Sequence, residues 1–450
     1  MPVGGLGSKL ARLRFVSRAD LVRQTGANAV ATAGPQLFLL AMTPLLVSRL
    51  ALGGYGIWTF CLATIAIASN VDGGLGPTIS RYFALYRGRG DEGAQHLLAT
   101  FATLSMLLLG GLSALVLHEV GGAIASHMHV HDALRSQAQV AVRDAGIVVG
   151  LGLLGNVFSG YLRGRASFGL VAVGAFAGIG GFLVYWAVTP ESKANVATYI
   201  HCAAAQNACT LVVWAIGAVI GGMRFAPAVP AFPEIREIFG FAWRSQIASA
   251  TSLVSLQADS LVIGAVCPVR TLGIYGIAAT VATAFRNLPF YALFPIRVRV
   301  TTIFGASALQ GANRALSELE RRWRPIIVGY SLIAAPVAVA IVYYWLTPRV
   351  GEAVVILFFL LVAYATDLAA GVRVAYANAV GQPGLLARLG VIALVINVGL
   401  TVPLVLVIGA YGVVGPTAIA SLVTTVYIFV VTPFGQSSTM GRVGTLREAT

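Results

Sequence analysis

The chain has 450 residues, of which 58% are hydrophobic and only 10% are charged, and its mean hydropathy is +0.84. This composition excludes an ordinary soluble domain, because such a domain needs more charge to cover its surface. The net charge of +14 would favour nucleic acid as a partner of a soluble protein. Here the charged residues lie between apolar runs, so we expect them to face anionic membrane lipid and expect no nucleic-acid partner.

Apolar runs of the roughly 20 residues that cross about 30 Å of hydrocarbon recur along the whole chain. They predict an all-α membrane protein with about twelve transmembrane helices. The expected spans, in chain order, are 26–48, 55–79, 97–117, 144–163, 168–188, 197–221, 241–267, 271–295, 325–346, 352–378, 386–408 and 412–434.

Basic residues are distributed unevenly between the two sides that these spans define. With the N-terminus placed in the cytoplasm, most of the 30 Lys and Arg residues fall on the cytoplasmic side. This bias predicts a multi-pass protein of the bacterial inner membrane with both termini inside. The expected segments are a basic cytoplasmic arm (1–24), an N-terminal six-helix lobe (25–221), a cytoplasmic linker (222–240), a C-terminal six-helix lobe (241–434) and a cytoplasmic tail (435–450).

A six-residue motif occurs twice in the same orientation. Leu52–Ile57 (LGGYGI) recurs 220 residues later as Leu272–Ile277 (LGIYGI), with five of the six positions identical. Each copy lies on the external side, at the start of an even-numbered span. A repeat of this kind, six spans apart, predicts two parallel six-helix lobes around a central cavity, related by an axis along the membrane normal.

Polar side chains follow one face of the first span and one face of the seventh, at the spacing of helical turns. For single Ser or Thr positions we favour ordinary interhelical hydrogen bonds, whereas the stripes that contain Gln36 and Asp259 predict the lining of a hydrated cavity. The stripes are Asn28, Thr32, Gln36 and Thr43 in the first span, and Ser245, Ser249, Ser252 and Asp259 in the seventh. Beside Gln36, Gly34-Pro35 interrupts the first span, and because proline kinks a helix we expect a hinge there.

Three segments carry a resemblance to a known family. Val71–Tyr82, followed by Gly90-Asp91, resembles the Asp-x-Gly-Leu…Arg-Tyr…Gly-Asp pattern of O-antigen and exopolysaccharide flippases. Glu237–Tyr275 is similar to the start of their second lobe, and Ala377–Gly412 to their last two spans. From about residue 25 to about residue 434, the chain resembles the polysaccharide-lipid flippases of the multidrug/oligosaccharidyl-lipid/polysaccharide exporter superfamily.

This resemblance implies alternating access and a cargo of isoprenoid-pyrophosphate-linked oligosaccharide, moved from the cytoplasmic to the periplasmic leaflet during lipopolysaccharide or exopolysaccharide biosynthesis. One alternative is a cation-coupled multidrug exporter of the same superfamily, which would concentrate carboxylates in its cavity. A less favoured one is a membrane-embedded transferase, which would need a cluster of acidic or His residues that we do not find. We therefore expect a transporter, not an enzyme, and no cofactor. Whether a polysaccharide polymerase is a partner stays open.

Charged side chains inside the expected spans cost at least about 2.5–3.5 kcal/mol each, so they are candidate functional residues. Arg286 is the first candidate for substrate contact, because a guanidinium suits bidentate binding of a pyrophosphate or an acidic sugar. Pairing with a structural carboxylate is the alternative for Arg286. For Arg373 substrate contact and simple snorkelling to the headgroups are equally good explanations.

Three aspartates also fall inside the spans. Asp259 and Asp367 are candidates for a coupling H⁺ or Na⁺, and Asp259 is favoured because it completes the polar stripe. Asp72 is expected to be structural, as a helix cap or as a partner of Arg81.

Three histidines, His127, His129 and His131, alternate in an external loop. In an extended loop they would lie on one side, as a metal site requires. We favour a solvated loop and expect no metal.

Overall fold

The computed structural model of the chain describes residues 18–72, 74–190, 195–228, 232–346, 350–380 and 382–432. In this part of the chain the backbone is helical apart from short connections, and it contains no β-strand; His129 and Pro268 form an isolated bridge. The predicted all-α fold is confirmed. The helices are α2 (Arg18–Ser69), α3 (Leu75–Arg89), α4 (Glu92–Ser126), α5 (Asp132–Gly164), α6 (Phe168–Val188), α7 (Val196–Ile220), α8 (Phe232–Val266), α9 (Val269–Leu346), α10 (Val350–Val380), α11 (Pro383–Ile408) and α12 (Val414–Val431), with 3₁₀ turns η2 (Asn70–Asp72) and η4 (Gly409–Val413).

Eight segments of the described chain are long and apolar enough to cross a membrane. Two of them, Ala31–Asp72 and Gly384–Val431, are interrupted at Ala51 and at Gly409 and are long enough to cross twice. A shorter apolar stretch, Leu253–Val266, lies in α8. The chain is therefore a multi-pass membrane protein.

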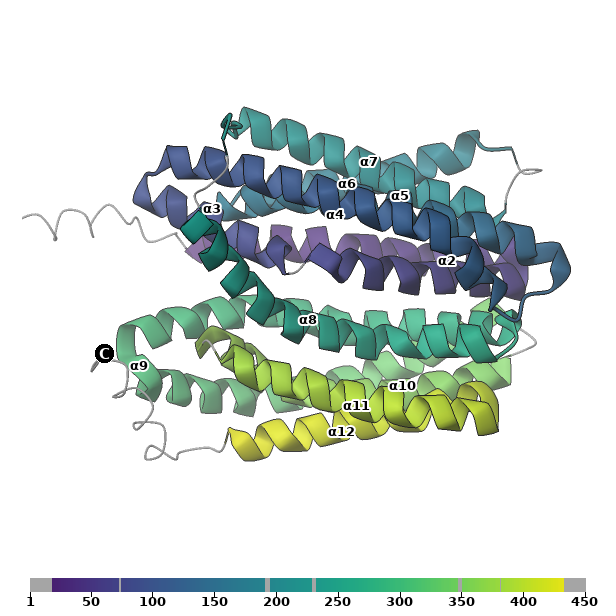
Figure 1. Ribbon diagram of the computed structural model, residues 1–450. Helices are drawn as coiled ribbons and strands as arrows, with labels where there is room; N and C mark the ends of the chain where they lie inside the picture. The colour runs from purple at the N-terminus through teal and green to yellow at the C-terminus, as the bar shows by residue number, and fades with distance from the viewer. Residues whose placement is uncertain are drawn as a thin grey trace, which may run out of the picture.

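Two of the helices fold back on themselves. In α2 the backbone leaves the helical region at Ala51 (φ 53°, ψ 177°), and the side chains of Thr43 and Tyr55 interact, although a straight helix would separate them by about 18 Å. In α9 the Tyr330 hydroxyl donates to the carbonyl oxygen of Phe285 at 2.8 Å, although the two residues are 45 positions apart in sequence. Each of these helices therefore forms two antiparallel arms (Figure 1).

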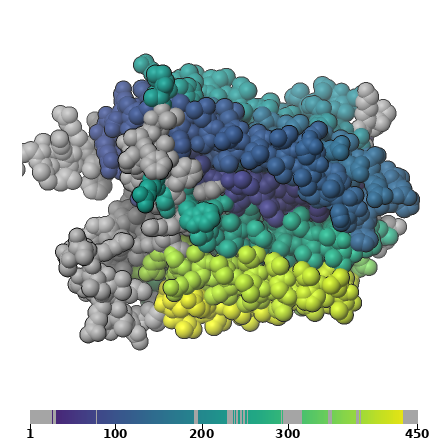
Figure 2. Space-filling view, in the orientation of Figure 1, coloured from purple at the N-terminus to yellow at the C-terminus, as the bar shows by residue number. Residues whose placement is uncertain are grey.

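The helices are arranged in two lobes, as predicted. Helices α2 to α7 form the N-terminal lobe and α9 to α12 the C-terminal lobe, which appear as separate layers in Figures 1 and 2. We call the end of the molecule that carries the connection between α4 and α5 the outer end. The opposite end, where α2 begins and α12 finishes, is the inner end.

Helix α8 belongs to both lobes. Near its start, Ile238 and Ala242 are buried in the apolar core of the N-terminal lobe. There, the Gln246 amide also donates to the side-chain oxygen of Asn70 at 2.8 Å. Further along, α8 packs on α11, and the Asn397 amide donates to the carbonyl oxygen of Ser255 at 3.3 Å. The boundary between the lobes therefore passes through α8.

The turn at Asp72 holds α3 against α8. The Asp72 carboxylate accepts hydrogen bonds from the backbone N–H groups of Gly74 (3.0 Å) and Gly76 (3.1 Å), which confirms the predicted helix cap. Gly74 has φ +75°, and a Cβ there would overlap the carbonyl oxygen of Ala242. Only glycine satisfies both demands at this position.

Two predicted boundaries shift. Helix α2 begins at Arg18, inside the predicted arm, and α8 begins at Phe232, inside the predicted linker 222–240. Glu234, Arg236 and Glu237 lie in the first turns of α8, where Pro233 costs no helical hydrogen bond. Residues 1–17 and 433–450, which include the predicted tail, lie outside the described chain.

Candidate functional site

An ion pair within the membrane-spanning part lies where the lobes meet. Nε of Arg286, on the first arm of α9, donates to Oδ2 of Asp367 on α10 at 2.9 Å. The two side chains are 22% and 24% exposed, so neither is sealed in the core. The sequence offered pairing with a carboxylate as the alternative role for Arg286, and the structure contains such a pair. It brings two predicted site residues together.

Aromatic rings hold the guanidinium in place. Its central carbon lies 5.0 Å from the ring centre of Phe290 and 5.6 Å from that of Tyr364. Both distances are within the range of a cation–π contact. A cation that is stacked on two rings and paired with one carboxylate is oriented without using all of its hydrogen-bond donors.

A hydrogen bond joins this ion pair to the other lobe. Asn287 accepts from Nη1 of Arg286 at 3.4 Å, and its amide donates to the side-chain oxygen of Gln36 on α2 at 3.0 Å. Gln36 is a predicted site residue, whereas Asn287 was missed. The sequence did contain a signal for Asn287, because it is an amide residue directly after an arginine within an expected span.

Arg286 retains binding capacity. Of its five N–H donors, the hydrogen bonds above use one at Nε and one at Nη1. Within the described residues no hydrogen bond engages Nη2. An anionic group that enters between the lobes could therefore bind this edge of the guanidinium without first displacing Asp367.

The two copies of the repeated motif pack against each other at the outer end. A Cβ at Gly56 would overlap the carbonyl oxygen of Val269, and a Cβ at Gly273 would overlap that of Leu52. The Tyr55 and Thr280 hydroxyls, from opposite lobes, lie 3.3 Å apart. The motif thus marks more than the internal symmetry, because its glycines allow the backbones of the two lobes to touch. The lobes are closed against each other at this end.

Asp259 lies in a different environment from Arg286. Its side chain is 3% exposed and sits inside the C-terminal lobe, not at the lobe interface. It accepts hydrogen bonds from the hydroxyls of Thr417 (2.9 Å), Tyr275 (3.3 Å) and Thr401 (3.5 Å). The side-chain oxygen of Asn397 accepts from Thr401 at 3.0 Å.

These contacts make a small oxygen-rich cage from α8, α9, α11 and α12. No Arg, Lys or His of the described chain forms an ion pair with Asp259. A buried carboxylate without a basic partner is costly as a bare charge. A proton or a bound monovalent cation would remove that cost.

Arg373 is enclosed by protein. Its exposure is 2%, and its Nε and Nη2 each donate to one oxygen of Glu320 at 3.2 Å. Nη1 donates to the carbonyl oxygens of Phe429 (3.1 Å) and Thr432 (2.6 Å), and the Phe429 ring lies 4.0 Å below the guanidinium. We therefore propose a structural role for Arg373 in place of the predicted substrate contact.

The remaining predicted residues are placed less completely. The backbone of α2 stays helical at Gly34 and Pro35, so the hinge there remains a prediction. Thr32 is half-buried on the same helix. The side chains of Asn28 and Ser252 lie outside the described part of the structure.

The alternating histidines do not gather. His127 bonds through its ring to the Ala123 carbonyl oxygen at 2.8 Å, the backbone carbonyl of His129 accepts from Val269 at 3.2 Å, and His131 precedes α5. Within the described ranges no three His, Cys, Asp or Glu side chains are grouped as a metal site.

The fold of the chain is similar to that of solved transporters of the MOP superfamily. No family model matches the chain. The chain superposes on the inward-facing conformation of a multidrug resistance MATE family transporter of that superfamily with a TM-score of 0.71 and 16% identity, covering 93% of this chain and 99% of the other. For the outward-facing conformation the TM-score is 0.68 and the identity 18%, with 95% and 96% covered.

A curated relative points to a narrower group. The chain is 21% identical over 276 residues to a "Putative O-antigen transporter" of Shigella flexneri, which covers 60% of this chain and 64% of that protein. The match thus spans less than two thirds of the relative's length. Together with the fold, it supports the predicted resemblance to flippases of this superfamily.

Proposed function

We propose that the protein is a flippase that moves isoprenoid-pyrophosphate-linked oligosaccharides from the cytoplasmic to the periplasmic leaflet of a bacterial inner membrane. The observation that carries the proposal is the Arg286 guanidinium at the lobe interface, which is paired with Asp367 and still has donors to offer. A pyrophosphate offers several acceptor oxygens, and Arg is well suited to bind them in pairs. The similarity to a protein described as an O-antigen transporter supports the same cargo class.

In this proposal the closed outer end belongs to a loading state. With the backbones of Gly56 and Gly273 against the opposite lobe, a substrate would reach Arg286 from the inner end or from the lipid at the side. Binding of the head group would weaken the links of Arg286 to Asp367 and Asn287. Because Asn287 bonds to Gln36 of the other lobe, the lobes would then be freer to move apart at the outer end.

We assign the coupling ion to Asp259 rather than to Asp367. Asp367 is already neutralised by Arg286, whereas Asp259 lacks a basic partner in the described structure. The hydroxyl oxygens around Asp259 and the amide oxygen of Asn397 are hard oxygen ligands of the kind that Na⁺ prefers. The same cage would stabilise a proton on the Asp259 carboxylate. Occupation of the cage by H⁺ or Na⁺ would link the ion gradient to the packing of α8 on α11.

The rival function is export of cationic drugs, which the fold alone would allow. A site for organic cations needs uncompensated carboxylates, but the carboxylate at this interface is paired with an arginine. The electrostatics at the lobe interface therefore favour an anionic head group.

Deletion of the gene and complementation with variants test the proposal. We expect lipid-linked oligosaccharide to accumulate in the inner leaflet after deletion and to clear when wild type is restored. Arg286→Ala, at equal membrane level, should clear it roughly tenfold or more slowly, as expected when charge-assisted hydrogen bonds of about 1.5–3 kcal/mol are lost. Arg286→Lys, which keeps the charge but loses the planar fork, should be intermediate. If deletion causes no accumulation and instead sensitises cells to cationic drugs, the exporter function replaces the flippase.

A further inference from the structure

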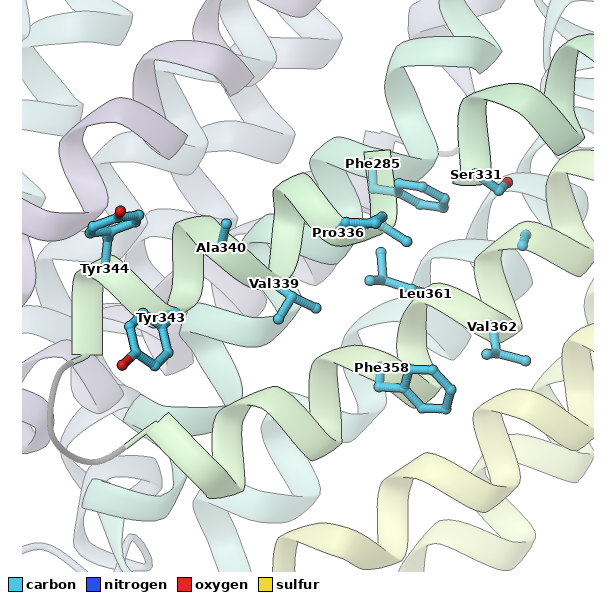
Figure 3. A pocket seen from close by; sticks show the side chains of 12 residues that line it. Phe285, Ser331, Pro336, Val339, Ala340, Tyr343, Tyr344, Phe358, Leu361 and Val362 are labelled. Carbon is cyan, nitrogen blue, oxygen red and sulfur yellow. The ribbon is translucent and has the colours of Figure 1, made fainter. Parts of the chain in front are cut away.

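An apolar groove opens between the second arm of α9 and α10. Its volume is about 630 Å³, within the range of roughly 300–1,000 Å³ that ligand sites occupy. Figure 3 shows Tyr343 and Tyr344 at one end and Phe285 and Ser331 at the other. Of the lining side chains, only Ser331 and the two tyrosines carry a polar atom, so the groove suits a hydrocarbon.

The shape of the groove follows from small residues on the second arm of α9 and on α10. Ala335 and Ala340 on α9 and Ala365 on α10 leave space that larger side chains would fill, and the neighbouring Leu361 and Val362 keep the wall apolar. The groove runs along α9 from Ser331 to Tyr344, which corresponds to about 20 Å of helix.

The two ends of the groove differ. At the outer end, Tyr343 and Tyr344 are 56% and 81% exposed, as is usual for tyrosines at a membrane interface. At the other end, the Ser331 hydroxyl is buried and has no hydrogen-bond partner among the described residues. A buried hydroxyl without a partner is costly, so a polar atom of a ligand would be stabilised there.

The groove and the candidate site share their walls. Phe285, which closes the bottom of the groove, directly precedes Arg286, and the Tyr330 hydroxyl fixes its backbone. On α10, Ala365 faces the groove, while Tyr364 and Asp367 contact Arg286. Arg286 therefore lies next to the groove: it is adjacent to Phe285 on α9, and its partners on α10 lie within one helical turn of Ala365. This combination matches an amphipathic lipid with an anionic head group.

We infer that this groove holds the hydrocarbon chain of the same lipid carrier whose pyrophosphate binds Arg286, so that the transporter selects its cargo by chain as well as by head group. The inference rests on the proposed function and specifies where the isoprenoid lies. With the head group at Arg286, the chain passes Ser331 and runs along α9 toward the tyrosines at the outer end. An ordinary phospholipid in the groove is the competing occupant.

Binding measurements on the whole protein in phospholipid nanodiscs test this inference. The probes are two prenyl pyrophosphates with the same head group, one with a short chain and one with a long chain. Ala335→Phe and Ala340→Trp fill the groove. Leu332→Trp is the matched control, because Leu332 lies on the same arm, is 72% exposed and does not line the groove.

We expect wild type and Leu332→Trp to prefer the long chain. The two groove variants should lose roughly tenfold of that preference, the factor expected from about two methylene groups left unburied, with short-chain affinity unchanged. Arg286→Ala should weaken both probes equally. If the groove variants keep the wild-type chain preference while Arg286→Ala still weakens binding of both probes, the groove does not hold the chain, and the proposed flippase function is unaffected. The same result is expected if phospholipid occupies the groove. If wild type binds neither probe, the proposed function fails and the inference fails with it.

Discussion

Two arginine–carboxylate pairs join α9 to α10, and they differ in almost every respect except their chemistry. Arg286 and Asp367 are 22% and 24% exposed and share one hydrogen bond. Arg373 and Glu320 are 2% and 1% exposed, share two hydrogen bonds, and have further partners in α12 and at Arg324. One pair lies at the lobe interface, and the other lies inside the C-terminal lobe near its inner end.

The difference shows how the same chemistry serves two purposes in a membrane protein. A buried bidentate pair whose guanidinium also binds Phe429 and Thr432 fixes the packing of three helices, because breaking it would strand a charge in low dielectric. A partly exposed pair with donors to spare can bind a further anion. Intramembrane charge therefore marks function only when the surroundings leave it unsatisfied.

The largest effect that tests this comparison is expected from Arg373→Ala. Removing the guanidinium leaves Glu320 buried without its main partner, which costs about 3–5 kcal/mol. The same change at Arg286 should destabilise the protein less, because Asp367 is 24% exposed whereas Glu320 is 1% exposed. The measurement is thermal unfolding of both variants in detergent, with the yield of folded protein in membranes as a second readout. If Arg286→Ala destabilises the protein as much as Arg373→Ala does, the distinction between the two pairs is wrong.

An intermediate effect is expected from Asp259→Asn, which tests a carboxylate that has no arginine partner. The amide keeps the shape and can still accept from Thr417 and Tyr275, so the variant should fold. A one-unit pH gradient supplies about 1.4 kcal/mol per proton, enough for roughly tenfold accumulation of substrate. We expect Asp259→Asn in liposomes to lose the response to an imposed H⁺ or Na⁺ gradient and to retain downhill movement.

Asp367→Asn is the matched control for this prediction. It removes the other candidate carboxylate but leaves the cage around Asp259 intact, so the response to the gradient should persist. Loss of that response in Asp367→Asn, with Asp259→Asn still coupled, would reverse the assignment of the ion site.

The helical spans and the two lobes could be predicted from sequence because hydrophobic length and charge bias act over many residues at once. The repeat around Tyr55 and Tyr275 correctly pointed to two equivalent lobes. It did not show that the two copies touch, because a close contact between backbones depends on which pairs of glycines face each other in space. The symmetry was thus visible in the chain, but the closed outer end was not.

The site could be predicted only in part. Arg286, Asp367 and Gln36 stood out as polar residues within apolar runs, and they do lie together. Glu320 did not stand out, because it falls between the expected spans 271–295 and 325–346. As a result, the sequence offered no buried partner for Arg373. A charged residue can be assigned to a pathway or to the core only when its neighbours from other helices are known.

The smallest effect is expected at the hydrogen bond between the lobes. Asn287→Ala removes the link to Gln36, worth about 1 kcal/mol, and should shift the balance between closed and open outer ends roughly fivefold. Distances between spin labels at Ser48 and Arg270, exposed positions of opposite lobes, would report this balance in a background without the four natural cysteines. Gln36→Ala should give the same shift, and the double variant should add nothing further, since both changes break one bond. Additive shifts would mean that Asn287 and Gln36 act separately. The hydrogen bonds from Arg286 through Asn287 to Gln36 would then not couple the substrate site to the opposite lobe.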